Sequence, residues 1–207
     1  KVISHIHNNN PWMKKINLKT IVYLLSTIRY KKILIVSKSI IDEYVFKKFI
    51  NKKIEIVGNI IDINRIKKLS EQENINENYD IIFIGRLTEQ KQPEKFIEIV
   101  KELKQENKNI KSIMLGEGPL KEKCKQYIKE YNLENNIELK GFQKNPYVYL
   151  KNSKVLCMTS KYEGYGLVAV EALSLGKPVV ATNVGGIPNI VNAVSYTHLT
   201  LPTNSRV

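Results

Sequence analysis

The sequence has few cysteines and no long apolar run. Its two cysteines, Cys124 and Cys157, form neither a CxxC motif nor a metal-ligand cluster. Each lies within an apolar pattern, which predicts two small buried side chains and a reducing compartment. No stretch approaches the roughly 18 apolar residues of a membrane span, and no signal peptide is evident. We therefore expect a cytoplasmic protein that is soluble or peripheral to the membrane.

Acidic residues are scarce in the first third of the chain. Residues 1–69 contain 15 Lys and Arg against 4 Asp and Glu, a net charge of +11, whereas residues 70–207 are close to neutral at +2. A basic unit of this kind suits nucleic acid, an anionic membrane surface or a phosphorylated substrate. An ordinary solvated, lysine-rich surface explains the charge equally well, so composition alone does not choose a partner.

Both ends of the chain differ from those of an intact domain. The sequence begins at Lys1, already inside an apolar run, and we expect that an upstream part is missing. The segment from Val194 to Thr203 resembles a translated sequencing adapter, so residues 194–207 are expected to be a non-native tail. The alternative is a native β-rich tail.

Apolar strands and amphipathic helices alternate from Tyr79 onward, which is typical of a parallel sheet covered by helices. This pattern predicts a Rossmann-like, doubly wound α/β domain over residues 64–193. Strands are expected at 80–84, 113–115, 137–139, 154–158 and 178–182. Helices are expected at 93–107, 120–131 and 167–175, with a short one opening at 145–147 and a stub after Gly186.

The pattern of residues 1–63 predicts the end of a second domain of the same type. Strands are expected near 2–6, 33–36 and 54–57, and helices near 16–29 and 39–49. Residues 58–63 would form the linker. Ligands commonly bind between two such domains.

The segment from Lys161 to Glu171 places two carboxylates around a glycine-rich turn between a strand and a helix. Ligands of α/β sheets bind at the carboxyl ends of strands, where the following helix also offers free N–H groups. Glu163 is therefore expected to lie in a ligand crevice. Glu171 lies about two helical turns further on, so a ligand with two separated polar ends would suit the pair.

A second strand end carries positive charge. Arg86 and Lys91 follow Gly85, between a strand and a helix, and could together hold a diphosphate. Taken alone, they could equally be ordinary surface cations. The turn at Gly116 is a weaker signal.

Five segments, taken together, resemble one known family. GRLTEQK, GEGP, GFQKNPY, TSKYEGYGLVAVEAL and GKPVVATNVGGIP occur in the order and spacing of retaining glycosyltransferases of family 4, the group 1 enzymes with the two-domain GT-B fold. The resemblance is strong over about residues 79–192 and looser before them. It implies a hexosyltransferase-type enzyme that uses a nucleotide-sugar donor and a glycan or lipid-linked acceptor in cell-surface polysaccharide synthesis.

The resemblance also assigns roles by position. Arg86 and Lys91 match the pair that holds the diphosphate, Glu163 the carboxylate at the donor sugar, and Glu171 the carboxylate at the ribose. The loop whose backbone approaches the donor is matched by Gly164, Tyr165, Gly166 and Leu167, and Gly85 is a further donor-binding position. The base would lie near residues 139–142.

A family histidine near the donor sugar is matched by His7, although His5 competes for the same place. The three aspartates, Asp42, Asp62 and Asp80, form no Asp-x-Asp motif, which argues against a metal-held diphosphate. No cofactor and no metal are therefore expected, and Arg86 and Lys91 would stabilise the departing diphosphate.

Two alternatives remain open at this point. One is a sugar-nucleotide epimerase of the same fold, and the other is a non-catalytic basic module that binds nucleic acid or a membrane through residues 1–69. The family resemblance favours the transferase, with no nucleic-acid partner and with an anionic membrane surface as a further partner. The 207 residues alone are expected to be inactive, because much of the acceptor domain would be absent.

Overall fold

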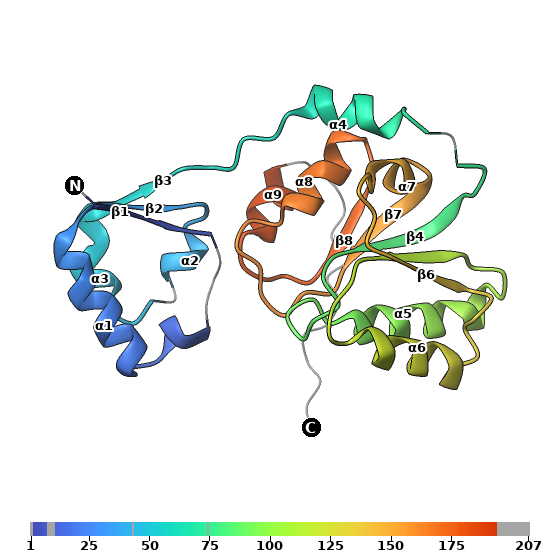
Figure 1. The fold of residues 1–207 in the computed structure, drawn as a ribbon, viewed down its shortest axis with the longest axis horizontal. Helices are drawn as coiled ribbons and strands as arrows, with labels where there is room; N and C mark the ends of the chain where they lie inside the picture. Colours follow the sequence, from blue (N-terminus) through green and yellow to red (C-terminus); the bar gives the residue numbers. More distant parts are fainter. Residues whose placement is uncertain (1, 8–10, 43, 74, 194–207) are drawn as a thin grey trace.

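The structure is a computed structural model, and it describes residues 2–7, 11–42, 44–73 and 75–193. The chain forms two parallel β-sheets, which appear as separate lobes joined by the segment between β3 and α4 (Figure 1). The predicted non-native tail at 194–207 lies outside the described residues. No helix within the described ranges is long and apolar enough to cross a membrane.

The smaller sheet has three strands in the order β1-β2-β3, all parallel. Its strands are β1 (Val2–Ile6), β2 (Tyr30–Ile35) and β3 (Ile54–Ile56). Its helices are α1 (Leu18–Ser26), α2 (Ser39–Asp42) and α3 (Lys47–Ile50), with 3-10 turns η1 (Pro11–Lys14), η2 (Thr27–Arg29) and η3 (Asn51–Lys53). This part of the predicted fold is confirmed, apart from the helix at 39–49.

The predicted continuous helix at 39–49 is wrong, because the chain forms two short helices there. The backbone N–H of Val45 donates to the carbonyl oxygen of Met13 at 3.1 Å instead of continuing the helical ladder. The Tyr44 ring is buried, and its hydroxyl donates to the carbonyl oxygen of Thr20 at 3.2 Å. Contacts with distant parts of the chain therefore interrupt a segment whose local pattern is helical.

The segment after β3 contains a helix that the sequence pattern did not predict, α4 (Ile63–Ser70). Asp62 caps it by accepting a 2.9 Å hydrogen bond from the backbone N–H of Arg65, as is typical of an N-cap. The helix packs against α7 and α8 of the larger domain. It therefore belongs to the surroundings of the larger sheet.

The larger sheet has five parallel strands in the order β6-β5-β4-β7-β8. The strands are β4 (Tyr79–Ile84), β5 (Ser112–Leu115), β6 (Ile137–Gly141), β7 (Ser153–Met158) and β8 (Val179–Ala181). The helices are α5 (Pro93–Glu106), α6 (Lys121–Glu130), α7 (Tyr147–Lys151), α8 (Leu167–Ser174) and α9 (Ile187–Ala193). This is the predicted Rossmann-like, doubly wound α/β sheet.

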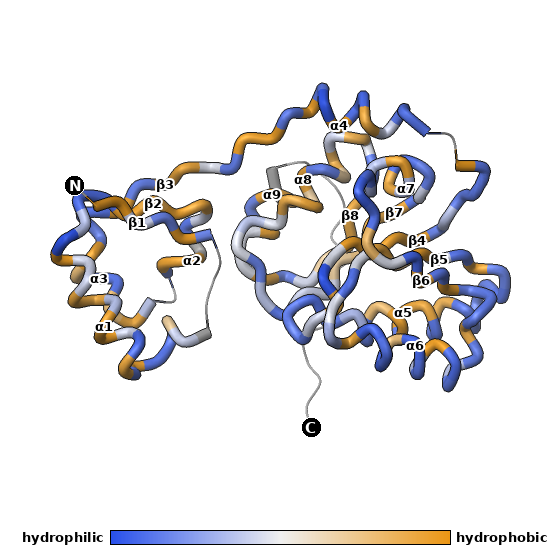
Figure 2. Tube along the Cα trace, viewed as in Figure 1, coloured by the Kyte–Doolittle hydropathy of each residue, from blue (hydrophilic) through white to orange (hydrophobic). Residues whose placement is uncertain are grey.

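Helices cover both faces of this sheet, so its central strands are mostly apolar on both sides. Ile81 and Phe83 of β4 pack with α5 and α6, whereas Ile82 packs with α7, α8 and α9. Figure 2 shows hydrophobic residues in the central strand β4, whereas the edge strand β6 also contains hydrophilic ones. Cys124 and Cys157 are both buried, as predicted, and burial raises the pKa of their thiols to about 11 and about 12.

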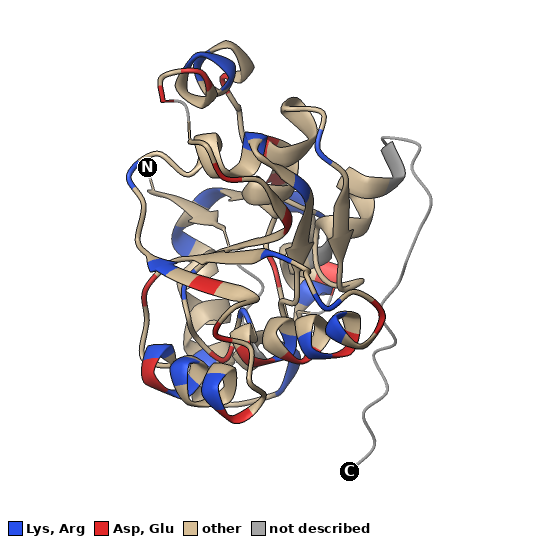
Figure 3. Cartoon of the chain, turned by 90° about the vertical axis from the view of Figure 1, so that its right-hand side faces the viewer, with Lys and Arg blue, Asp and Glu red and all other residues tan. Residues whose placement is uncertain are grey.

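Charge is distributed differently in the two lobes, as the sequence indicated. Lys, Arg, Asp and Glu are interspersed over the helices of the larger domain (Figure 3), and ion pairs such as Lys123 with Glu94 link α6 to α5. Residues 63–193, which include α4, hold 20 Lys and Arg against 16 Asp and Glu, a net charge of +4. Residues 1–62 hold 12 against 4, a net charge of +8, so the smaller lobe carries most of the excess positive charge.

Candidate functional site

The strand order of the larger sheet reverses between β4 and β7. Chain connections leave these two neighbouring strands in opposite directions, which creates a crevice at their carboxyl ends where doubly wound proteins bind ligands. The loop after β4 spans residues 85–92, and the loop after β7 spans residues 159–166. These loops contain Arg86, Lys91 and Glu163.

The two loops are joined by hydrogen bonds. The side-chain amide of Gln90 donates to the carbonyl oxygen of Tyr162 at 3.1 Å, and the N–H of Lys161 donates to the carbonyl oxygen of Gln90 at 2.8 Å. The Thr159 hydroxyl lies 2.8 Å from the carbonyl oxygen of Lys91. The backbone of Lys91 is thus fixed against the strand that precedes Glu163.

An ion pair between Lys91 and Glu163 crosses this switch point. The ammonium of Lys91 donates to Oε1 of Glu163, and only 16% and 7% of the two side chains are exposed. The hydroxyl of Ser160 donates to the same oxygen at 2.8 Å. The sequence placed both charged residues at strand ends, and the structure brings them into direct contact.

The backbone at Gln92, directly after Lys91, is unusual. Gln92 lies in the left-handed region, with φ of +46°, where a residue with a side chain costs of the order of 1–3 kcal/mol. The Thr159 hydroxyl, which also lies 2.9 Å from the carbonyl oxygen of Gln92, holds this conformation. Pro93 then begins α5. This turn sets the position from which the Lys91 side chain reaches Glu163.

The loop that contains Glu163 packs against the turn after β8. A Cβ atom at Gly185, whose φ is +59°, would lie 1.7 Å from the carbonyl oxygen of Glu163, so only glycine fits there. Gly164 is buried and Tyr165 is half-buried. Gly166, with φ of +86°, precedes α8, which begins at Leu167. The predicted donor-binding loop is therefore a tightly packed turn into a helix.

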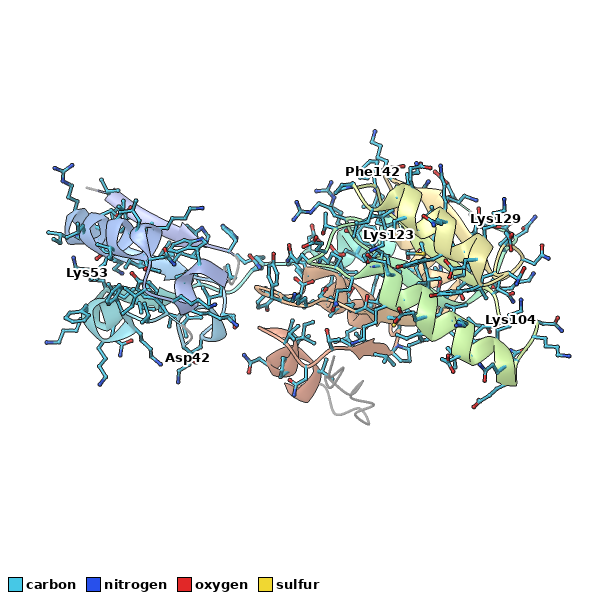
Figure 4. All side chains as sticks on the ribbon, turned by 90° about the horizontal axis from the view of Figure 1, so that it is seen from below. Asp42, Lys53, Lys104, Lys123, Lys129 and Phe142 are labelled. Carbon is cyan, nitrogen blue, oxygen red and sulfur yellow. The ribbon has the colours of Figure 1, made fainter. Side chains whose placement is uncertain are left out.

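A pocket of about 440 Å³ opens beside the crevice, at the carboxyl ends of β4, β5 and β6. Its lining is mostly apolar and consists of Ile84, Gly85, Arg86, Leu115, Gly116, Glu117, Phe142, Gln143 and Pro146. Arg86 is exposed here and does not join the Lys91 ion pair. Phe142 is 73% exposed, which is unusual for an aromatic side chain, and Figure 4 shows it at the surface of the larger domain.

Glu171 lies on α8 and has a partner that the sequence did not suggest. Its Oε1 accepts a 3.1 Å hydrogen bond from the Tyr147 hydroxyl, at the start of α7. Burial raises the pKa of Glu171, and the Tyr147 hydrogen bond partly offsets this rise. Burial and the neighbouring Glu171 charge raise the pKa of Tyr147 to about 12. Glu163 and Glu171 thus have different partners.

His7 follows β1 in the smaller lobe. Its ring centroid lies 3.9 Å from that of His5, and both residues line a pocket of about 310 Å³ with Trp12, Met13 and Tyr23. The structure therefore does not choose between the two histidines. A role for His7 at the donor sugar remains a prediction.

Sequence reasoning missed Ser160, Tyr147 and Thr182 as neighbours of the site. All three lie within motifs that carry the family resemblance, so a motif position was the available signal. No cluster of three His, Cys, Asp or Glu side chains that could hold a metal ion occurs among the described residues. The switch point instead has one buried ion pair, Lys91 with Glu163, and the exposed charges of its two loops include Arg86.

Comparisons with known proteins agree with this arrangement. Residues 65–205 match the model of the glycosyl transferases group 1 family. The chain is 39% identical to an uncharacterized glycosyltransferase of Methanocaldococcus jannaschii over 167 residues, which cover 75% of this chain and 40% of the relative.

A second relative comes from Campylobacter jejuni, the N-acetylgalactosamine-N,N'-diacetylbacillosaminyl-diphospho-undecaprenol 4-alpha-N-acetylgalactosaminyltransferase. It is 34% identical over 132 residues, which cover 64% of this chain and 35% of that enzyme. The chain thus spans well under half the length of either relative.

The fold matches solved structures as well. The Anabaena protein HepE, solved in complex with UDP-glucose, superposes with a TM-score of 0.78 at 22% identity over 97% of this chain and 58% of HepE. This likeness identifies the fold as that of GT-B glycosyltransferases. The family model matches more than half of the chain, and the larger domain contains the matched motifs, so the chain belongs to the group 1 glycosyl transferases.

Proposed function

We propose that the protein transfers a hexose-type sugar from a nucleotide-sugar donor to a glycan or lipid-linked acceptor, with retention of configuration, during assembly of cell-surface polysaccharide. The observation that carries the proposal is the Lys91–Glu163 ion pair at the switch point, beside a mostly apolar pocket of about 440 Å³. Together they offer a cation for a diphosphate, a carboxylate for sugar hydroxyls and an apolar surface for a base.

In this proposal the base, ribose, diphosphate and sugar of the donor each bind a different part of the site. The base would stack against Phe142 in the apolar pocket, and the ribose would meet Glu171 near the start of α7. The diphosphate would lie between exposed Arg86 and Lys91, close to the amino terminus of α8. The sugar would then reach Glu163. Each moiety meets the kind of side chain that its chemistry requires.

The reaction follows from this placement. The bond between the anomeric carbon and the phosphate oxygen breaks, and Arg86 and Lys91 stabilise the negative charge that develops on the diphosphate. The acceptor hydroxyl attacks from the same face, and its proton passes to the departing phosphate oxygen. Glu163 orients the sugar by accepting its hydroxyl hydrogen bonds. In this scheme the two cations do the work that a metal ion does elsewhere, and no cofactor is needed.

The acceptor side is proposed from the smaller lobe and from a relative's name. The Campylobacter relative is named for an acceptor linked to diphospho-undecaprenol, which is a lipid. Exposed apolar side chains lie along one side of α1: Leu18, Ile21, Val22 and Leu25. Exposed Lys15 and Lys19 flank them. We therefore place the protein in the cytoplasm, peripheral to an anionic membrane surface.

The catalytic proposal is tested by variants of the complete protein. Glu163→Gln and Lys91→Ala should abolish sugar transfer, whereas Lys154→Ala is the matched control. Lys154 pairs with Asp80 at 2.7 Å, at the opposite ends of the same two strands β7 and β4. Full transfer by either site variant would refute the assignment.

Two further outcomes separate the alternatives. An epimerase would change the sugar of the donor without releasing nucleoside diphosphate, which NMR of the products detects.

The proposed binding to an anionic membrane surface is tested by flotation with phosphatidylglycerol vesicles at low salt. A complete protein that ignores these vesicles would refute that part alone.

A further inference from the structure

The two oxygens of the Glu163 carboxylate have different surroundings. Oε1 accepts hydrogen bonds from the Lys91 ammonium and from the Ser160 hydroxyl, the latter at 2.8 Å. No hydrogen bond to Oε2 occurs among the described residues, and Oε2 is not among the buried atoms left without a partner. Oε1 is thus the anchored oxygen, and Oε2 is the one that remains available to a ligand.

Ser160 is itself held rigidly. The residue is 2% exposed, and its carbonyl oxygen accepts a hydrogen bond from the Thr182 hydroxyl, directly after β8. The N–H of Thr182 in turn donates to the carbonyl oxygen of Met158 at 3.0 Å. Ser160 is therefore fixed between the ends of β7 and β8, and its hydroxyl has a defined direction.

The two groups that hold Oε1 differ in what a donor does to them. In the proposed function Lys91 also contacts the diphosphate, so donor binding draws its ammonium toward a second anion. Ser160 is buried and fixed by β8, and it has no competing partner among the described residues. Its hydroxyl has a single proton, which it donates to Oε1. Ser160 therefore keeps hold of the carboxylate when Lys91 turns toward the phosphates.

We propose that Ser160 is a positioning residue that directs Oε2 of Glu163 toward the hydroxyls of the donor sugar. This inference rests on the proposed function and extends it. It predicts that Ser160 contributes to recognition of the sugar but not of the nucleotide, because it acts only through Glu163. A purely structural serine would affect both equally.

The experiment compares affinities for UDP-glucose and UDP-N-acetylglucosamine with the affinity for UDP, measured by isothermal titration on the complete protein. Ser160→Ala is expected to reduce by about tenfold the advantage of the sugar nucleotide over UDP, with the affinity for UDP unchanged. Ser160→Thr, which keeps the hydroxyl, should restore most of this advantage. In a Glu163→Ala background, where no side chain remains for Ser160 to orient, Ser160→Ala should cause no further loss.

The chain offers a matched control at the other end of the same strand. Ser153 is also 2% exposed, and its hydroxyl donates a buried 2.7 Å hydrogen bond to the carbonyl oxygen of Tyr149. Ser153→Ala should therefore lower stability about as much as Ser160→Ala while leaving both affinities unchanged.

The outcomes separate the inference from the proposed function. The inference is overturned if Ser160→Ala weakens binding of UDP and of the sugar nucleotide equally, leaves both affinities unchanged, or adds its full effect to that of Glu163→Ala. If the wild type binds UDP but shows no preference for a sugar nucleotide, the inference also fails. If the wild type binds neither UDP nor a sugar nucleotide, the proposed function itself is refuted, and the inference with it.

Discussion

Replacing Lys91 by methionine is expected to destabilise the ligand-free protein by about 3 kcal/mol, because it leaves the Glu163 carboxylate buried without its cation. Only 7% of the Glu163 side chain is exposed. Breaking a buried pair typically costs about 3–5 kcal/mol, and the remaining Ser160 hydrogen bond favours the lower end of that range. At about 2–4 °C per kcal/mol, the melting temperature should fall by about 6–12 °C.

The opposite substitution should cost less. In Glu163→Gln the amide oxygen can still accept hydrogen bonds from Lys91 and Ser160, so a loss of about 1 kcal/mol is expected. The double variant should resemble Glu163→Gln, since no unpaired carboxylate remains. The two substitutions are therefore expected to be strongly non-additive.

The assay is urea denaturation of the four proteins, with Lys154→Met as the control. Lys154 also pairs with a carboxylate, but 78% of its side chain is exposed, so its removal should cost about 0–1 kcal/mol. If Lys91→Met destabilises the protein no more than Lys154→Met, or if the two site substitutions are additive, the ion pair is not the buried interaction described above.

Two further predictions concern the surroundings of the site. Gly185→Ala should weaken nucleotide-sugar binding and lower stability more than Gly176→Ala: both glycines have positive φ, but only a Cβ at Gly185 collides with the Glu163 carbonyl. Because burial raises the pKa of Glu171 above its ordinary 4.5, wild-type stability should decline as pH rises from about 4.5 to that raised value, and Glu171→Gln should flatten the decline.

Both predictions have clear contrary results. Equal effects of the two glycine substitutions in binding and thermal melts would show that the contact between the two turns has no consequence. A Glu171→Gln variant whose stability changes with pH in the same way as the wild type would show that Glu171 does not titrate differently in the folded state.

Much of the larger domain follows from local patterns. Alternating apolar strands and amphipathic helices predicted each of its strands, because a strand covered by helices on both faces must be apolar throughout. Position after such a strand also identified Glu163 as a ligand-facing carboxylate candidate. The helix α4 was missed even though Asp62, a favourable N-cap residue, precedes it.

Other features depend on contacts between distant residues and leave no periodic signal. The break within the predicted helix at 39–49 arises from the bond between Val45 and Met13, which only the folded chain brings together. The role of Ser160 depends on Thr182, which follows a different strand and lies beside it only because β7 pairs with β8. The hydrogen bond between Tyr147 and Glu171 likewise joins two different helices, α7 and α8, which only the folded chain brings together.

The central claim is that the switch point of the larger domain binds a sugar nucleotide, and one measurement tests it most directly. Isothermal titration of the complete protein against a panel of sugar nucleotides should reveal at least one that binds. Lys91→Ala should weaken that binding by about tenfold or more, whereas Lys154→Ala should not. Absence of binding throughout the panel, or equal binding by the Lys91→Ala variant, would contradict the account.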